Sequence, residues 1–281
     1  MQDNKKLYKW LHSVAGITAI ILFIISVALL LFVKWFVDDS AVNFNSFLIG
    51  LATNLLGIIV TVSFVQYFID KQNIEKERRE EAAKILRYHK IMILLIERYT
   101  LFFQCVTSTI EKRSECVKSM DLLRDFSFSD MADLYKLSTV LSVELLRPSI
   151  ELFYEAEQML RNYMIEMIKN IDFKYNKNIE NVLIEFIKKS KEMDVSGVII
   201  NNQQILFGNK KSSEEVSQSI KEEKNKWVEK YLQGQLYSNQ MTPYVMLFLL
   251  LKEEGRLVTE YQRLITTVLK CETAQHECQI T

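Results

Sequence analysis

The chain has 281 residues, 49% of them hydrophobic and 25% charged, and its 35 basic and 35 acidic residues give a formal net charge of zero. A nucleic-acid-binding domain usually carries a basic excess, so this balance argues against direct nucleic-acid binding. The charges are unevenly distributed, because residues 14–33 and 40–69 contain none. Each uncharged stretch supplies about the 20 apolar-dominated residues that a helix needs to cross a bilayer.

These stretches predict two transmembrane helices, residues 14–36 and 47–69, joined by a short loop at residues 37–46. Core helices of a soluble protein normally carry charges on at least one edge, which these stretches lack. A cleaved signal peptide is the alternative for the first stretch, but the apolar run is too long and no small-residue cleavage site follows. Lys34, Trp35 and Asp38 follow instead, which is typical of a membrane interface.

The flanking charges predict the orientation of this hairpin. The N-terminal tail, residues 1–13, contains Lys5, Lys6 and Lys9, and six basic residues follow the second helix between residues 71 and 87. Basic flanks are retained on the cytoplasmic side of a membrane. Both termini are therefore predicted to be cytoplasmic, with the loop between the two helices on the outer side of the membrane. The lipid bilayer is the first expected partner of the chain.

A polar helical stalk, residues 70–84, and an α-helical cytoplasmic domain, residues 85–281, are predicted to follow. The stalk has favourable i, i+4 ion pairs and would extend about 22 Å at 1.5 Å per residue. From Ile85 an apolar period returns, and Glu97 and Arg98 in its middle indicate a buried cytoplasmic helix rather than a third span.

Residues that typically begin helices divide the predicted cytoplasmic domain into separate helices. Pro148 and Thr242–Pro243 open helices, another helix covers residues 177–191, Ser129 caps a short helix from Asp130, and Ser212 with Glu215 forms a capping box. Residues 197–207 allow either a small β-hairpin, turning at Asn201–Asn202, or an irregular loop. The fold class is therefore all-α: a transmembrane hairpin, a stalk and a helical bundle.

The search for chemistry is mostly negative, and no catalytic residue, cofactor or metal is expected. The chain has no Gly-rich phosphate loop, no His-Glu-x-x-His and no Cys-x-x-Cys. Cys271, His276 and Cys278 lie close together but lack the usual zinc spacing and a fourth ligand, so a frayed tail is the alternative. Three aspartates could be read as paired carboxylates, but helix capping and a solvated helix face explain them more simply: Asp125, Asp130 and Asp133.

A polar stripe in the second uncharged stretch is the strongest candidate site. Gly50, Asn54, Gly57 and Thr61 fall within an arc of about 60° on a helix. In lipid, small residues allow close helix approach and a buried amide needs a partner. The stripe predicts either packing against Ala15, Ala19 and Ser26 of the first helix, or self-association, with a water-filled path as one form of it. Gln66, on the opposite face near the inner boundary, would then be a second contact.

The chain resembles a group of bacterial proteins with two transmembrane helices. The resemblance rests on its layout and on three segments, "VQYFIDKQNIEKERREEAAK", "FSFSDMADLYKLS" and "RPSIELFYEAEQMLRNYMIEMI". Some members of that group are effectors of anti-phage systems, including retron-associated ones. The resemblance implies a place in a bacterial inner membrane, with the loop at residues 37–46 in the periplasm. It also implies a cytoplasmic sensor domain, with a protein or ribonucleoprotein partner, that drives oligomerisation and a membrane event. Two alternatives stay open: an inert anchor or scaffold, and an enzyme whose site the sequence does not disclose.

Overall fold

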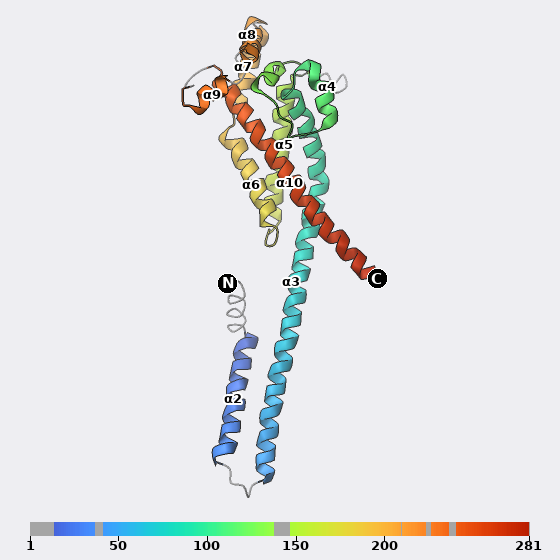
Figure 1. The fold of residues 1–281 in the computed structure, drawn as a ribbon, viewed down its shortest axis with the longest axis vertical. Coiled ribbons are helices and arrows are strands. Elements are labelled where there is room, and N and C mark those ends of the chain that lie inside the picture. The colour runs from blue at the N-terminus through green and yellow to red at the C-terminus, as the bar shows by residue number, and fades with distance from the viewer. Residues whose placement is uncertain are drawn as a thin grey trace. The chain divides into compact units, whose positions relative to one another are not determined.

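The computed structural model describes residues 14–36, 42–137, 147–208, 210–222, 226–235 and 240–280. Across these ranges the chain is mostly helical and has no strand; one antiparallel bridge joins Leu137 and Pro148. The all-α fold is therefore confirmed for this part of the chain (Figure 1). In chain order the elements are α2 (Val14–Phe36), α3 (Val42–Val106), α4 (Ile110–Ser119), the 3-10 helix η1 (Phe128–Asp133), α5 (Ser149–Asn170), α6 (Lys177–Glu192), α7 (Ser196–Gly208), α8 (Lys210–Glu222), α9 (Lys226–Leu232) and α10 (Thr242–Ile280).

The chain divides into two compact units, Met1–Arg79 and Glu80–Thr281, called here unit 1 and the helical domain. The division lies inside α3, a single helix of 65 residues. Residues 70–80 of α3 are exposed along their whole length, as expected for the predicted stalk, whereas Glu81 is only 6% exposed. The exposed stretch thus ends at residue 80, four residues before the predicted limit of the stalk at residue 84.

Unit 1 contains α2 and the first part of α3, and it buries very little apolar surface. The most apolar part of α3 has a mean hydropathy of 2.2, yet only 11% of it is buried. By length and composition α3 is the one helix, among the residues described, that can cross a membrane; the corresponding apolar stretch of α2, Ala19–Phe32, is shorter. The structure therefore supports one candidate span where the sequence predicted two.

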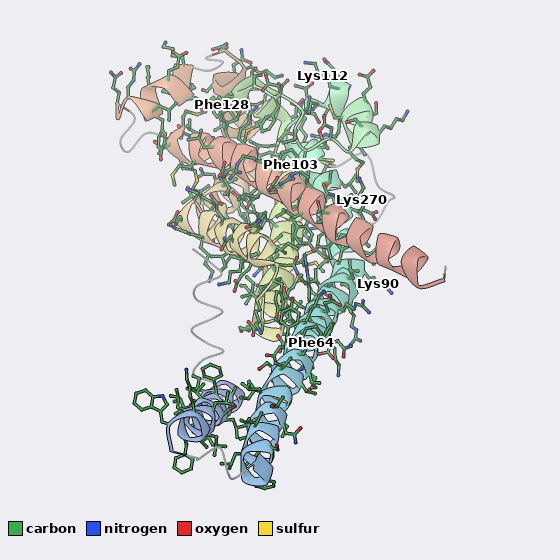
Figure 2. The ribbon with its side chains drawn as sticks, turned by 60° about the horizontal axis from the view of Figure 1, so that its bottom comes forward. Phe64, Lys90, Phe103, Lys112, Phe128 and Lys270 are labelled. Carbon is green, nitrogen blue, oxygen red and sulfur yellow. The ribbon has the colours of Figure 1, made fainter. Side chains whose placement is uncertain are left out.

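The helical domain has a large apolar core. The apolar period of α3 is confirmed, since Ile85, Met92 and Tyr99 are all fully buried, and α6 packs against both α5 and α10. Phe103 of α3 and Phe128 of η1 lie within this unit (Figure 2). The rings of Phe103 and Phe126 are 5.8 Å apart, as are those of Phe128 and Phe248, and both pairs meet edge to face.

A carboxylate from α3 fixes the start of α6. Glu81 accepts hydrogen bonds from the backbone N–H groups of Tyr175 and Asn176, at 2.9 and 2.8 Å, and from the Asn176 side chain at 2.9 Å. The first N–H groups of a helix have no partner within the helix, and its N-terminus favours negative charge. Glu81 therefore supplies the cap that α6 lacks in its own sequence.

Both alternatives predicted for residues 197–207, the small β-hairpin and the irregular loop, are wrong, because this segment forms α7. Asp194 accepts a hydrogen bond from the backbone N–H of Ser196 at 3.0 Å, which caps the new helix. Val195 and Ile199 are both buried at helical i, i+4 spacing, and Tyr135 donates a hydrogen bond to the Ile199 carbonyl. Tertiary burial at this spacing outweighs the strand propensity of the isoleucines.

Two predicted caps are also misplaced. Ser127, not Ser129, caps the short helix: its N–H and hydroxyl both donate to Asp130 Oδ2 at 2.8 Å. Ser212 lies inside α8, which begins at Lys210, so it does not open that helix. The capping acid Asp130 was identified, but its serine partner lies two residues earlier because the first turn is a 3-10 turn.

Candidate functional site

The two helices of unit 1 meet through small side chains. Ser26 of α2 donates a hydrogen bond to the Ala52 carbonyl of α3 at 2.9 Å, and both residues are fully buried. Ala19 and Leu48, at 7% and 8% exposure, extend this contact. Close backbone approach of this kind is how helices associate where apolar burial offers no gain. The sequence analysis identified Ala19 and Ser26 as packing residues, but not Ala52 as their partner.

The predicted polar stripe lies on the other side of α3. At 100° per residue, Gly50, Asn54, Gly57 and Thr61 stand about 140–200° around the helix from Ala52. All four are exposed, and a Cβ atom added at Gly50 or Gly57 would meet nothing within 4 Å. The stripe therefore does not pack against α2, which was one of its two predicted roles.

The polar groups of the stripe, and Gln66 on the opposite face of α3, differ in how they are satisfied. Thr61 donates to the Gly57 carbonyl of its own helix at 2.9 Å, and the Gln66 amide donates to Asp70 at 3.1 Å. The Asn54 amide makes no hydrogen bond to any residue that the structure describes. Asn54 is thus the member of the stripe that still requires a partner, whereas Gln66 already has one. Self-association stays a prediction.

A second candidate site lies inside the helical domain, where two carboxyl groups are buried. Glu157 of α5 is 5% exposed and Glu254 of α10 is fully buried. Tyr99 of α3 donates a hydrogen bond to Glu254 Oε2 at 2.8 Å. Burial, together with the charge of Glu157, raises the pKa of Glu254 well above its usual range. The site thus favours the neutral form of Glu254.

Glu157 has polar partners that Glu254 lacks. Ser190 of α6 donates a hydrogen bond to Glu157 Oε1, and Arg161 Nη1 lies 3.4 Å from the same oxygen and 2.5 Å from Ser190 Oγ. Burial raises the pKa of Glu157, although the Ser190 hydrogen bond and the Arg161 charge oppose the shift. A carboxyl held between burial and a cation in this way is typical of functional sites, although structural ion pairs show the same pattern.

Two polar atoms in this region have no hydrogen-bond partner within the described part of the chain: Glu254 Oε1 and the Tyr154 hydroxyl. Tyr154 is only 8% exposed, and its pKa is raised by burial and by the charges of Asp194, Glu254 and Glu157. An unpaired buried polar group costs about 1–3 kcal/mol, so each such group invites an explanation.

A pocket of about 390 Å³ opens beside these groups, and Tyr154, Glu157, Arg161 and Asp194 are among its lining residues. Pockets that hold small ligands span roughly 300–1,000 Å³. The volume therefore suits a small molecule, and the pocket joins the surface to the buried carboxyl of Glu157.

Other residues singled out in the sequence have structural roles or are not described. Asp125 pairs with Lys252 at 2.7 Å, Asp130 caps η1, and Asp133 accepts a hydrogen bond from the Ile110 N–H at 2.9 Å. The backbone of α10 is helical to Ile280, but the side chains of Cys271, His276 and Cys278 lie outside the description. Among the side chains described, no group of three or more acidic, His or Cys residues could hold a metal ion.

The sequence analysis missed the buried carboxyl pair, although a signal existed. Glu157 stands four residues after Phe153 and three before Leu160, which are both apolar and buried on α5. Glu254 occupies the same kind of position between Leu250 and Leu257. An acid in the middle of an apolar stripe is a candidate for burial, but its partner on another helix depends on tertiary packing.

Comparison of this chain with known protein families, with curated proteins and with solved structures finds no match. Function is therefore argued from the two candidate sites described above.

Proposed function

We propose that the chain is a bacterial inner-membrane effector: α2 and residues 42–69 of α3 form a transmembrane hairpin that self-associates and perturbs the membrane. The low burial of α3 carries this proposal. A core helix of a soluble protein would bury its apolar residues, whereas Val60 and Phe64 are 65% and 64% exposed. An apolar surface of this extent requires a cover, and lipid is the simplest.

The orientation follows from the flanking charges, with both termini and the helical domain in the cytoplasm. The direction of the polar stripe supports self-association. Ala52 faces α2, so the opposite face of α3 is available to another copy of the chain. In hydrocarbon an unpaired amide such as that of Asn54 is costly, and the same Asn54 of a second copy would satisfy it. The resemblance to anti-phage effectors supplies the expected consequence, arrest or death of an infected cell.

A non-catalytic membrane anchor is the second candidate, and the Ser26–Ala52 contact favours it. A hairpin closed by its own hydrogen bond needs no further copy to insert stably, and the helical domain would then recruit a cytoplasmic partner. The two candidates differ in whether the stripe contacts another chain.

Asn54→Leu separates them. The change keeps similar volume and raises hydrophobicity, so insertion should be retained or improved. Each interhelical hydrogen bond is worth only about 0.6–2 kcal/mol, but an oligomer loses one in every subunit. We expect normal expression and localisation, weaker crosslinked oligomers, and loss of the depolarisation that overexpression causes in a membrane-potential dye assay. The matched control is Thr53→Val, since the Thr53 hydroxyl donates to the Ile49 carbonyl of its own helix at 2.6 Å.

Cysteine crosslinking tests the direction of the stripe itself. In a chain whose native cysteines are replaced by alanine, oxidation should link copies that carry Gly57→Cys. Copies that carry Ala52→Cys should stay monomeric, because Ala52 faces α2. Equal crosslinking at both positions, or normal depolarisation with Asn54→Leu, would favour the anchor.

A further inference from the structure

We infer that an exposed face of α3 in the helical domain is a docking surface for an acidic amphipathic helix of a partner protein. The face is a stripe of five residues, called here the α3 seam: Lys84, Arg87, Ile91, Leu94 and Arg98. At 100° per residue they fall within an arc of about 80°, and they extend over about 21 Å of the helix. The inference holds whether or not the hairpin self-associates.

The α3 seam points away from the core of the helical domain. All five of its side chains are exposed. The buried residues of the same stretch, Ile85, Met92 and Tyr99, stand about 100–140° around the helix from the centre of the seam. No element that the structure describes therefore covers the seam.

The centre of the seam is apolar. Ile91 and Leu94 are 51% and 62% exposed, and their i, i+3 spacing makes them neighbours on the helix surface. The seam as a whole alternates between spacings of three and four residues, which is the spacing of a helix that packs against another helix. Covering this apolar pair would stabilise a complex with such a helix.

Both ends of the seam are cationic and unpaired. Lys84, Arg87 and Arg98 are exposed and make no ion pair with any residue that the structure describes. By contrast, Arg256 of α10 lies 2.7 Å from Glu253. Unpaired ammonium and guanidinium groups can bind the carboxylates of a partner, and a guanidinium group can do so with two parallel hydrogen bonds.

The charges argue against pairing of the seam with the same seam of a second copy. In a parallel pair, Lys84, Arg87 and Arg98 would each face the same residue of the other copy. In an antiparallel pair, Lys84 would face Arg98. Like charges in these positions oppose association. A helix with apolar residues in its central turns and acidic residues in its outer turns complements both parts of the seam.

A nucleic acid would use only part of this surface. Its phosphates would pair with the cations, but Ile91 and Leu94 offer it little, and the seam has no aromatic residue on which a base could stack. An acidic helix is the partner that uses both the charges and the apolar centre.

The test is fluorescence anisotropy with the full chain in nanodiscs of zwitterionic phosphatidylcholine. The probe is a labelled, designed helical peptide of about 20 residues, long enough to cover the seam, with leucines in its central turns and glutamates in its outer turns. We expect saturable binding at one site that weakens as salt is added. A peptide with lysine at every glutamate should not bind. A peptide with glutamine at every leucine should bind at least about fivefold more weakly.

Three outcomes with these peptides would overturn the inference. The first is that the glutamate peptide does not bind. The second is that the lysine peptide binds as well, so that apolar contact alone suffices. The third is that the peptide without leucines binds equally, so that the seam accepts any polyanion.

Variants locate the surface. Leu94→Gln should weaken binding of the glutamate peptide at least about fivefold, because a half-exposed leucine is then left out of the contact. Ile184→Gln is its matched control, since Ile184 of α6 is 46% exposed, and it should leave binding unchanged. All these residues are exposed, so near-ultraviolet circular dichroism should match that of the parent chain. Equal affinity in the parent and Leu94→Gln would place the peptide elsewhere and contradict the inference.

Reversal of the charges gives a second, independent readout. The triple variant with Lys84→Glu, Arg87→Glu and Arg98→Glu should bind the glutamate peptide at least about tenfold more weakly, because like charges then meet. It should gain binding of the lysine peptide. Lys118→Glu, at an exposed position of α4, should change neither. A triple variant that still prefers the glutamate peptide would show that the seam is not the site.

A second copy as the occupant is tested separately from the polar stripe. In a chain that lacks its native cysteines and carries Asn54→Leu, copies with Leu94→Cys should not crosslink. Crosslinking there would assign the seam to another copy of the chain and overturn the inference, whatever the role of the stripe.

Discussion

In unit 1 the described buried side chains are mostly small, and in the helical domain many are large and apolar. Ala19, Ser26 and Ala52 are at most 7% exposed, while Phe64 on the same helix pair is 64% exposed. In the helical domain Phe103 is 1% exposed, and Arg98 five residues earlier is exposed. The two units are made of similar helices, and this difference is what the proposed function expects, with lipid around unit 1 and water around the helical domain.

The two units also differ in where their unpaired polar groups lie. In unit 1 the unpartnered amide of Asn54 is on the surface, whereas in the helical domain Glu254 and Tyr154 are in the interior. In each unit the unpaired group lies where its surroundings are expected to be apolar. The proposed self-association therefore begins from a cost that the interior of the helical domain also carries, that of a polar group removed from water.

A charge placed on the exposed apolar face of unit 1 is the strongest test of whether lipid covers that face. Val60→Lys would cost roughly 2.5–3.5 kcal/mol at the centre of a bilayer, but less than about 0.5 kcal/mol on a wet surface. We expect the variant to be lost from carbonate-washed membranes.

Ile74→Lys is its matched control, since Ile74 is 51% exposed and lies in the polar part of α3. This variant should stay in the membrane. If Val60→Lys is retained as well as its parent, the exposed apolar face of unit 1 is not covered by lipid.

Glu81→Ala tests where in α3 the exposed stretch ends and the helical domain begins. The change removes the cap of α6 and leaves partly buried N–H groups without their carboxylate partner, which should lower the free energy of unfolding of the helical domain by about 1–3 kcal/mol. Near-ultraviolet circular dichroism of the full chain should show Tm falling by about 2–4 °C per kcal/mol. Glu75→Ala, on the exposed part of the same helix, should change Tm little; equal effects would mean that the domain begins earlier in α3.

Much of the fold could be predicted because local patterns decide it. The period from Ile85 placed the buried face of α3, and a predicted helix at residues 177–191 agrees with α6 (Lys177–Glu192). What failed depends on contacts distant in sequence. Residue Ile199 is buried against Tyr135, which no local pattern discloses.

The candidate sites show the same limit. The spacing of the stripe around Asn54 was visible in the sequence, but its direction was not, since that depends on the contact between Ser26 and Ala52. Glu157 and Glu254 are far apart in the chain, so their shared effect on pKa could be recognised only after folding brought α5 and α10 together.

The interior of the helical domain is tested by Glu254→Gln, the smallest expected effect. Burial raises the pKa of Glu254, so the folded chain holds a proton that the unfolded chain releases above about pH 4.3. The free energy of unfolding should then fall as the pH rises from that value toward the folded-state pKa. Glutamine cannot titrate, so the fall of Tm with rising pH should be smaller in this variant than in the parent chain. Glu253→Gln is the control, because the hydrogen bond from Arg256 lowers the pKa of Glu253, which therefore stabilises the fold at neutral rather than acidic pH. That variant should lose a little Tm at pH 7 and keep the fall toward pH 8. If Glu254→Gln keeps the full fall, the carboxyl is ionised in the folded chain and the interior of the domain is more polar than its burial indicates.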